Sequence, residues 1–133
     1  MANRLFFLLL LGVATTGCSE SGTKLVQMSG VATFDGKPVP ALELRFYPIR
    51  GGRPASAITN GLGEFRVAFM QGKYGMLPGE QKVQIRYLDP TATNPRQMPA
   101  PYNKIIQKYG DLKRTELTLT IKEDQANYEL QLD

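Results

Sequence analysis

Hydrophobic and polar residues alternate along most of the chain after residue 24. The sequence Leu-Glu-Leu-Arg-Phe-Tyr at positions 42–47 shows the pattern most clearly. A period of two places successive side chains on opposite faces of a strand. A strand with one buried face and one solvent-exposed face is typical of antiparallel sheets. The same reading predicts six further strands, at 26–34 (interrupted by Gly30), 55–59, 65–69, 82–87, 117–121 and 128–132.

Turn-forming residues separate these segments. Asp35-Gly36 is a favoured pair for a tight hairpin, and further turns are expected at 60–63, 77–80 and 125–127. Seven short strands with turns at this spacing predict an all-β fold, a single seven-stranded antiparallel β-sandwich. Helix is expected only at 102–109, inside the proline-rich stretch 89–114.

Aromatic residues follow the same alternation. Tyr47 falls on an outward position of its predicted strand. The inward positions, which we expect to form part of the core, hold Phe46, Phe65, Phe69 and Tyr128.

The first residues follow a different pattern. Ten apolar or small residues run from 5 to 14, after Arg4 and before two threonines. A membrane-spanning helix needs about 20 apolar residues, and a buried core helix is disfavoured because the run is uniformly apolar at its start. A positive residue, a short apolar run and small residues together predict a secretory signal peptide at 1–17.

Cys18 is the only cysteine of the chain. The sequence Thr15-Thr16-Gly17-Cys18 resembles the lipobox of bacterial lipoproteins, although that family prefers Leu where Thr15 stands. The resemblance implies lipid on the Cys18 sulfur, cleavage before it and acylation of the new amine. The alternative is ordinary signal cleavage that leaves a free thiol. If Cys18 carries lipid, residues 18–24 are the lipidated cysteine and a flexible tether that spans at most about 20 Å. Residues 25–133 then form the domain.

The composition of the chain argues against several classes of function, beginning with nucleic-acid binding and catalysis. Loss of residues 1–17 leaves 116 of the 133 residues, which is one ordinary domain. Without Arg4, 15 basic residues face 12 acidic ones, and no run of five like charges exists, so we expect no nucleic-acid partner. The chain has no histidine and no glycine-rich phosphate-binding motif. We therefore expect no catalytic residues, no metal site, no cofactor and no enzyme activity.

Four motifs in order resemble one family of domains. They are Gly30 to Pro40 with its Asp-Gly turn, Thr-Asn-Gly-Leu-Gly-Glu-Phe at 59–65, Leu-Pro-Gly-Glu-Gln-Lys-Val at 77–83, and Lys-Tyr-Gly-Asp at 108–111 with Leu-Thr-Leu-Thr-Ile at 117–121. This order is similar to carboxypeptidase-regulatory-like, or transthyretin-like, domains of the bacterial lipoprotein type. Asn60 and Gln81 stand where the family usually has Asp and Tyr. The resemblance implies a small β-sandwich that serves as a non-catalytic accessory module.

The stretch 89–114 is the candidate binding loop, because binding residues concentrate on loops of rigid scaffolds. Its candidate contacts are Tyr102, Lys104, Lys108 and Tyr109, with Arg96 and Arg114 beside them. The alternative is that Ile105, Ile106 and Tyr109 are apolar plugs that close the edge of the sandwich.

Two function classes follow. The first is a lipid-anchored structural or protein-interaction module of the cell envelope, held on the outer membrane or on a periplasmic membrane face by lipid on Cys18. The second is a surface accessory protein that binds carbohydrate or peptide for nutrient uptake, with an envelope protein or glycan as partner. An exposed platform of aromatic rings would favour the second class, and buried rings the first.

Overall fold

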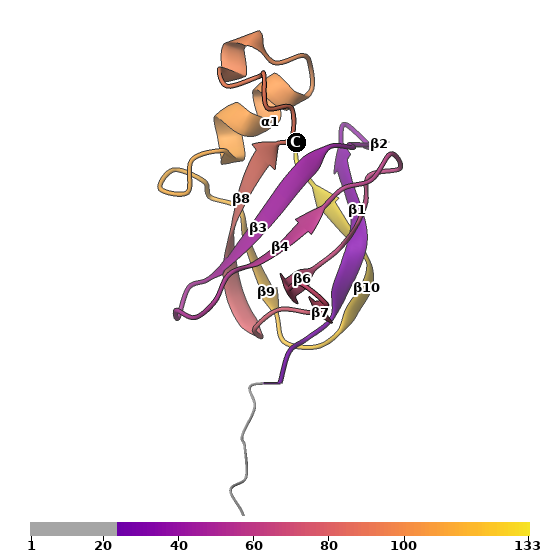
Figure 1. Cartoon of the computed structure of the whole chain (residues 1–133), viewed down its shortest axis with the longest axis vertical. Helices are drawn as coiled ribbons and strands as arrows, with labels where there is room; N and C mark the ends of the chain where they lie inside the picture. Colours follow the sequence, from indigo (N-terminus) through magenta and orange to yellow (C-terminus); the bar gives the residue numbers. More distant parts are fainter. Residues whose placement is uncertain (1–23) are drawn as a thin grey trace, which may run out of the picture.

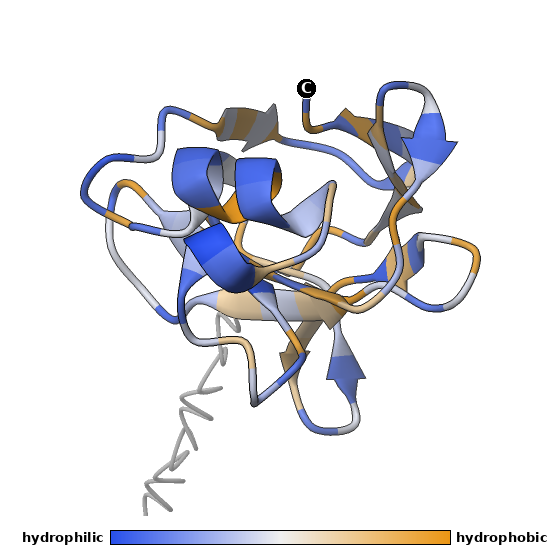
Figure 2. Ribbon diagram, turned by 90° about the horizontal axis from the view of Figure 1, so that it is seen from above, coloured by the Kyte–Doolittle hydropathy of each residue, from blue (hydrophilic) through white to orange (hydrophobic). Residues whose placement is uncertain are grey.

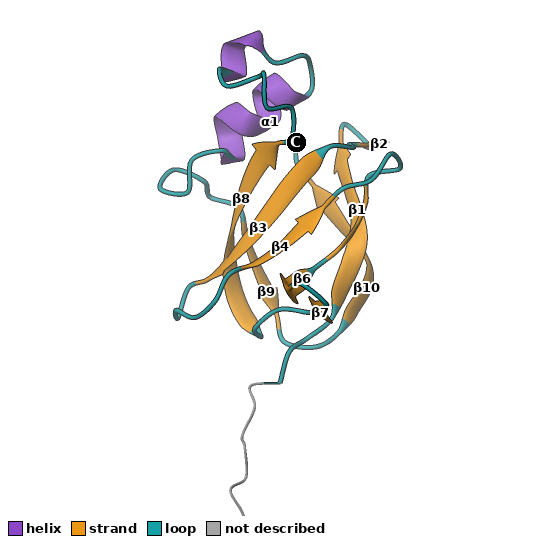
Figure 3. Ribbon diagram, in the orientation of Figure 1, coloured by secondary structure: helices purple, strands orange, loops and turns teal. Residues whose placement is uncertain are grey.

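The computed structural model describes residues 24–133, so the predicted signal peptide and Cys18 lie outside the described residues. Figure 3 shows that strands dominate and that helix is confined to one end. The strands are β1 (Met28–Phe34), β2 (Lys37–Pro38), β3 (Leu42–Pro48), β4 (Ala55–Ile58), β5 (Glu64–Arg66), β6 (Ala68–Met70), β7 (Lys73–Tyr74), β8 (Gly79–Tyr87), β9 (Thr118–Ile121) and β10 (Gln125–Gln131). The helices are the 3₁₀ turn η1 (Pro95–Gln97) and α1 (Tyr102–Tyr109).

The strands form two sheets that face each other across one core (Figure 1). The smaller sheet has the order β10-β1-β2, and β5 also pairs with β1. The larger sheet has the order β7-β6-β4-β3-β8-β9. The predicted all-β architecture with two sheets is therefore confirmed.

Residues 24–133 form ten strands instead of the predicted seven. Each of the seven predicted segments does form strand, but 65–69 divides into β5 and β6, and two-residue strands appear at β2 and β7. Such short strands leave no alternation of their own in the sequence, because a period of two needs about four residues to be recognised. The turn predicted at 125–127 is wrong, because these residues are the first part of β10.

Val67 is the point where the chain crosses from one sheet to the other. β5, just before it, pairs with β1, whereas β6, just after it, pairs with β4. The Val67 side chain is completely buried. Its N–H donates to the Met28 carbonyl and its carbonyl accepts the Gly75 N–H, both at 2.9 Å. This crossing explains why one predicted strand became two.

The prediction of a purely antiparallel fold is wrong for one pair, because β1 and β10 run parallel. Val31 lies opposite Glu129, and Ala32 lies opposite Leu130. The last strand reaches the first after the chain has passed through the larger sheet, so no hairpin dictates its direction. Side chains alternate equally in parallel and antiparallel strands, so the pattern carried no information on this point.

Gly30 allows β10 to approach β1 closely. A Cβ atom at this position would overlap the backbone carbonyl oxygen of Tyr128 on β10. The pairing also shifts register between Met28 and Gly30, which is a β-bulge. The glycine that interrupts the predicted first strand is thus the residue that lets the first and last strands pair.

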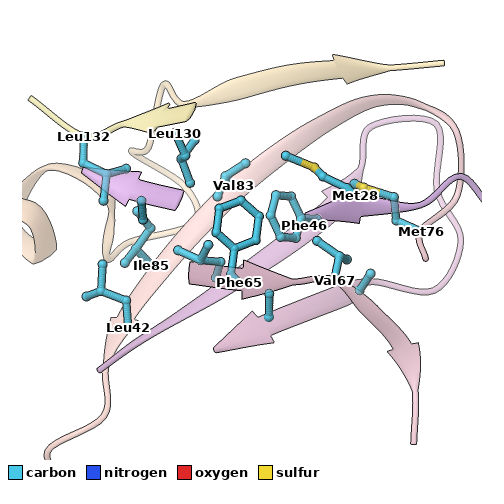
Figure 4. Packing of buried hydrophobic residues seen from close by; sticks show 14 of the residues in the cluster. Met28, Leu42, Phe46, Phe65, Val67, Met76, Val83, Ile85, Leu130 and Leu132 are labelled. Carbon is cyan, nitrogen blue, oxygen red and sulfur yellow. The ribbon is translucent and has the colours of Figure 1, made fainter. Parts of the chain in front are cut away.

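The core lies between the sheets and takes side chains from both (Figure 4). Phe46 and Phe65 are buried as predicted, and the partly buried Tyr128 packs against the core. The prediction that Phe69 lies in the core is wrong, because this residue is partly exposed. The Arg53 guanidinium and the Lys73 ammonium lie 5.8 and 6.0 Å from the centroid of its ring. The sheet change at Val67 ends the alternation that placed Phe69 inside.

α1 covers one end of the sandwich and begins and ends at the predicted residues. Most of α1 is coloured hydrophilic in Figure 2, and the helix buries Ile105 and Tyr109. The described chain starts at the opposite end (Figure 1). No helix within residues 24–133 is both long and apolar enough to cross a membrane.

Truncation of Leu44 tests the core. Leu44 is completely buried on β3, so Leu44→Ala should lower the free energy of unfolding by about 2–5 kcal/mol. Ile58→Ala on the neighbouring β4 is the matched control, because Ile58 is 60% exposed and should lose less than about 0.5 kcal/mol. Chemical denaturation of the full chain measures both, and equal losses would show that the face of β3 is misassigned.

Gly30→Ala tests the contact between β1 and β10. The added methyl group meets backbone that cannot move aside locally, so we expect a loss of about 3 kcal/mol, the upper end for overpacking. Gly61→Ala is the control, because no atom lies within 4 Å of the place that a Cβ would take there. A melting temperature of Gly30→Ala equal to that of Gly61→Ala would contradict the pairing.

Candidate functional site

The predicted binding stretch folds back onto the end of the sandwich. η1 is capped by Asn94, whose side-chain oxygen accepts the Arg96 N–H at 3.0 Å. Met98 is buried immediately after η1. α1 then packs on η1 and on the end of β8. The stretch is therefore a compact cap on the sandwich and not an extended loop.

Tyr102 is engaged in this packing. Its hydroxyl donates to the Pro40 carbonyl at 2.8 Å, which ties α1 to the segment before β3. Its ring stacks on Tyr87 of β8, with 4.0 Å between centroids and 21° between planes. Burial raises the pKa of Tyr102, and the neighbouring Tyr87 adds to the rise. Tyr102 therefore has one ring face already covered.

The apolar side of α1 closes the sandwich. Ile105 is completely buried, Tyr109 is 5% exposed, and Ile106 packs against the core. The end of the helix is held by Gln84 of β8, whose amide donates to the Gly110 carbonyl at 2.9 Å. The plug interpretation of these side chains is confirmed. Tyr109, a candidate binding residue, is in the core.

The basic side chains of the candidate binding loop differ in whether they already have a hydrogen-bond or salt-bridge partner. Lys108 is exposed, and its ammonium donates to the Asp133 carbonyl at 3.0 Å. Arg114 pairs with Asp111 at 3.1 Å on an exposed surface. Lys104 and Arg96 are exposed and form no ion pair within residues 24–133. Of the four candidate contacts predicted for this stretch, Tyr102 and Lys108 already form hydrogen bonds, Tyr109 is buried, and Lys104 is exposed without a salt bridge within residues 24–133.

Lys104 lines a small hollow that the sequence did not predict. The hollow has a volume of about 370 Å³ and lies between the β1–β2 hairpin and the start of α1. Apolar walls combine with two ammonium groups and one carboxylate, from Phe34, Asp35, Lys37, Pro38, Val39, Ala100, Pro101 and Lys104. Lys37 and Lys104 are far apart in the sequence, so no local pattern could have paired them. The arrangement suits a small anionic group attached to an apolar body.

The turn aspartates serve local structure. The Thr91 hydroxyl and N–H donate to Asp89 at 2.7 and 2.9 Å and lower its pKa. The Lys113 N–H does the same for Asp111. Within residues 24–133, no three His, Cys, Asp or Glu side chains gather closely enough to hold a metal ion.

Two of the motifs behind the family resemblance form well-defined turns. Asp35 and Gly36 both have positive φ, at 49° and 74°, between β1 and β2. The Asn60 side-chain oxygen accepts the N–H groups of Leu62 and Glu64, each at 3.0 Å. Comparison of the chain with models of protein families, with curated protein sequences and with solved structures gives no match. The resemblance stays a prediction.

Two substitutions in α1 distinguish a side chain that packs on the sandwich from one that lies on the protein surface. Tyr102→Ala removes the stack on Tyr87 and the bond to Pro40, so we expect a loss of about 1–3 kcal/mol in the free energy of unfolding. Lys104→Ala should change it by less than about 0.5 kcal/mol, because the side chain is exposed. Thermal melting of the full chain measures both, and an unchanged melting temperature for Tyr102→Ala would mean that α1 does not cap the sandwich.

Proposed function

We propose that this chain is a lipid-anchored, non-catalytic module of the cell envelope with a structural or protein-contact role. The observation that carries the proposal is the position of the first described residues, which follow the predicted lipid anchor at Cys18. Residues 24–26 lie at the end of the sandwich opposite α1 (Figure 1). An anchor at Cys18 would hold that end at the membrane and turn the α1 end away from it.

The start of the domain is firmly held. Val26 exchanges two backbone hydrogen bonds with Met76, each at 2.9 Å. The Gln27 N–H donates to the Asp124 carboxylate at 2.9 Å. The chain from Cys18 to Val26 covers at most about 28 Å when it is fully extended. Lipid on Cys18 would therefore keep the domain close to the bilayer, on the outer membrane or on a periplasmic membrane face.

The buried rings support a contact role over the stacking of sugar rings. Tyr109 is in the core, and Tyr102 is stacked on Tyr87. Carbohydrate recognition through aromatic platforms needs exposed rings, which α1 does not offer. Exposed charged residues such as Lys104 instead lie on α1, at the end that would face away from the membrane, and most of this helix is coloured hydrophilic in Figure 2.

A second candidate function is a surface accessory protein that binds carbohydrate or peptide for nutrient uptake. The hollow lined by Lys37 and Lys104 favours it, because two lysines against the single Asp35, beside apolar residues, complement an acidic glycan or an acidic peptide. The family resemblance supports either role, since carboxypeptidase-regulatory-like domains serve as accessory modules.

Cys18→Ser tests the anchor. The hydroxyl cannot take the thioether-linked lipid, so the variant should lose the lipid mass and remain uncut before residue 18. Mass spectrometry and membrane fractionation of cells that produce the full chain measure both. Ser21→Ala, a short distance along the chain, is the control and should behave as the wild type does. A soluble mature wild-type chain with an unmodified thiol would contradict the proposal.

A further inference from the structure

An open trough runs along the outer face of the smaller sheet, away from α1. Its volume is about 670 Å³. Alternate residues of β1 point inward, such as the completely buried Ala32. The residues between them, Ser29, Val31 and Thr33, line the trough. Their short side chains leave a hollow between the longer side chains of the neighbouring strands β5 and β10.

Two glutamates face each other across this trough. Val31 pairs with Glu64 of β5 on one side and with Glu129 of β10 on the other. Two strand spacings place the glutamate Cα atoms about 10 Å apart. Both side chains are exposed and line the trough. Their carboxylates therefore stand on opposite walls, with the methyl groups of Val31 between them.

Neither carboxylate is neutralised by a basic side chain within residues 24–133. Glu64 accepts a hydrogen bond from the Asn60 amide at 3.2 Å, and Glu129 accepts one from the Gln131 amide at 3.3 Å. Arg66 also lines the trough, but its guanidinium lies over the Tyr74 ring, 3.5 Å from the centroid. The trough thus keeps two free negative charges in a chain with a net charge of +4.

Thr33 supplies an independent observation at the same place. It is only 7% exposed, and its hydroxyl oxygen has no hydrogen-bond partner within the described residues. Buried hydroxyl groups are nearly always paired, and an unpaired one is unfavourable. Thr33 lines the trough two residues from Val31 on the same strand, so its hydroxyl is a candidate partner for a ligand that enters there.

We propose that the trough binds a lysine or arginine side chain presented by an extended segment of a partner protein. The cationic group lies between Glu64 and Glu129, and its alkyl stem lies on Val31. The trough is open, so it cannot enclose a free amine as small-molecule sites do. A partner that makes further contacts along the sheet overcomes that limit. The inference rests on the protein-contact role proposed above and assigns it a surface.

The experiment uses the full chain in detergent micelles and the peptide acetyl-Ala-Lys-Ala-amide. Titration followed by amide NMR shifts should show saturable changes at Ser29–Thr33, Glu64 and Glu129. A dissociation constant in the millimolar range is expected for one side chain without the rest of the partner. The same peptide with norleucine, which keeps the stem and lacks the charge, should produce no saturable shift. Added salt should weaken the binding of the lysine peptide.

Variants assign the binding to named groups. Glu64→Gln and Glu129→Gln each remove one charge at constant shape and should weaken binding by about threefold to fivefold. Glu116→Gln, an exposed glutamate outside the trough, should leave binding unchanged. Thr33→Val should weaken binding without lowering the melting temperature, because the hydroxyl it removes has no partner among residues 24–133.

Four results would overturn the proposal. They are equal shifts with the lysine and norleucine peptides, unchanged affinity in both trough variants, binding of 1,4-diaminobutane as tight as the peptide, and shifts at these amides caused by protein concentration alone. The last two would assign the trough to small amines or to a second copy of the chain. If the peptide does not bind the trough, the proposal of a lipid anchor at Cys18 still stands. If Cys18 carries no lipid, the peptide titration still tests the trough.

Discussion

The close approach of β1 and β10 at Gly30 determines the rest of the smaller sheet. No side chain other than hydrogen fits there, because a Cβ would overlap the Tyr128 carbonyl. The pair joins the first long strand of the domain to the last one, with Met28 opposite Gln125 and Thr33 opposite Gln131. It also sets the register that places Glu129 beside Val31, whose other neighbour, Glu64, comes from the pairing of β1 with β5.

Local features of the sequence were sufficient for much of the fold. Alternation at 42–47 correctly predicted β3 and its buried Leu44, and Asp35-Gly36 correctly predicted a hairpin turn. The bounds of α1 were also correct. These features depend on neighbours within a few residues, where strand period, helix period and turn chemistry act directly.

Features that depend on distant segments could not be predicted. The parallel direction of β10 leaves no mark on its side-chain pattern, and the sheet change at Val67 depends on partners at Met28 and Gly75. Tyr102 was a candidate for binding because a tyrosine in a proline-rich stretch has no visible partner in the sequence. In the structure its ring stacks on Tyr87 and its hydroxyl donates to the Pro40 carbonyl. The trough required three strands in register, which one sequence does not reveal.

The proposed role as an anchored protein-contact module relies on the same register, because it sets the two carboxylates across Val31. The most direct measurement is a nuclear Overhauser experiment on the folded full chain. Directly opposed side chains on neighbouring strands lie close enough for such contacts. We expect cross-peaks from the Val31 methyl protons to the side-chain protons of both Glu64 and Glu129. Cross-peaks to only one of them, or to residues one position away on β10, would contradict this register.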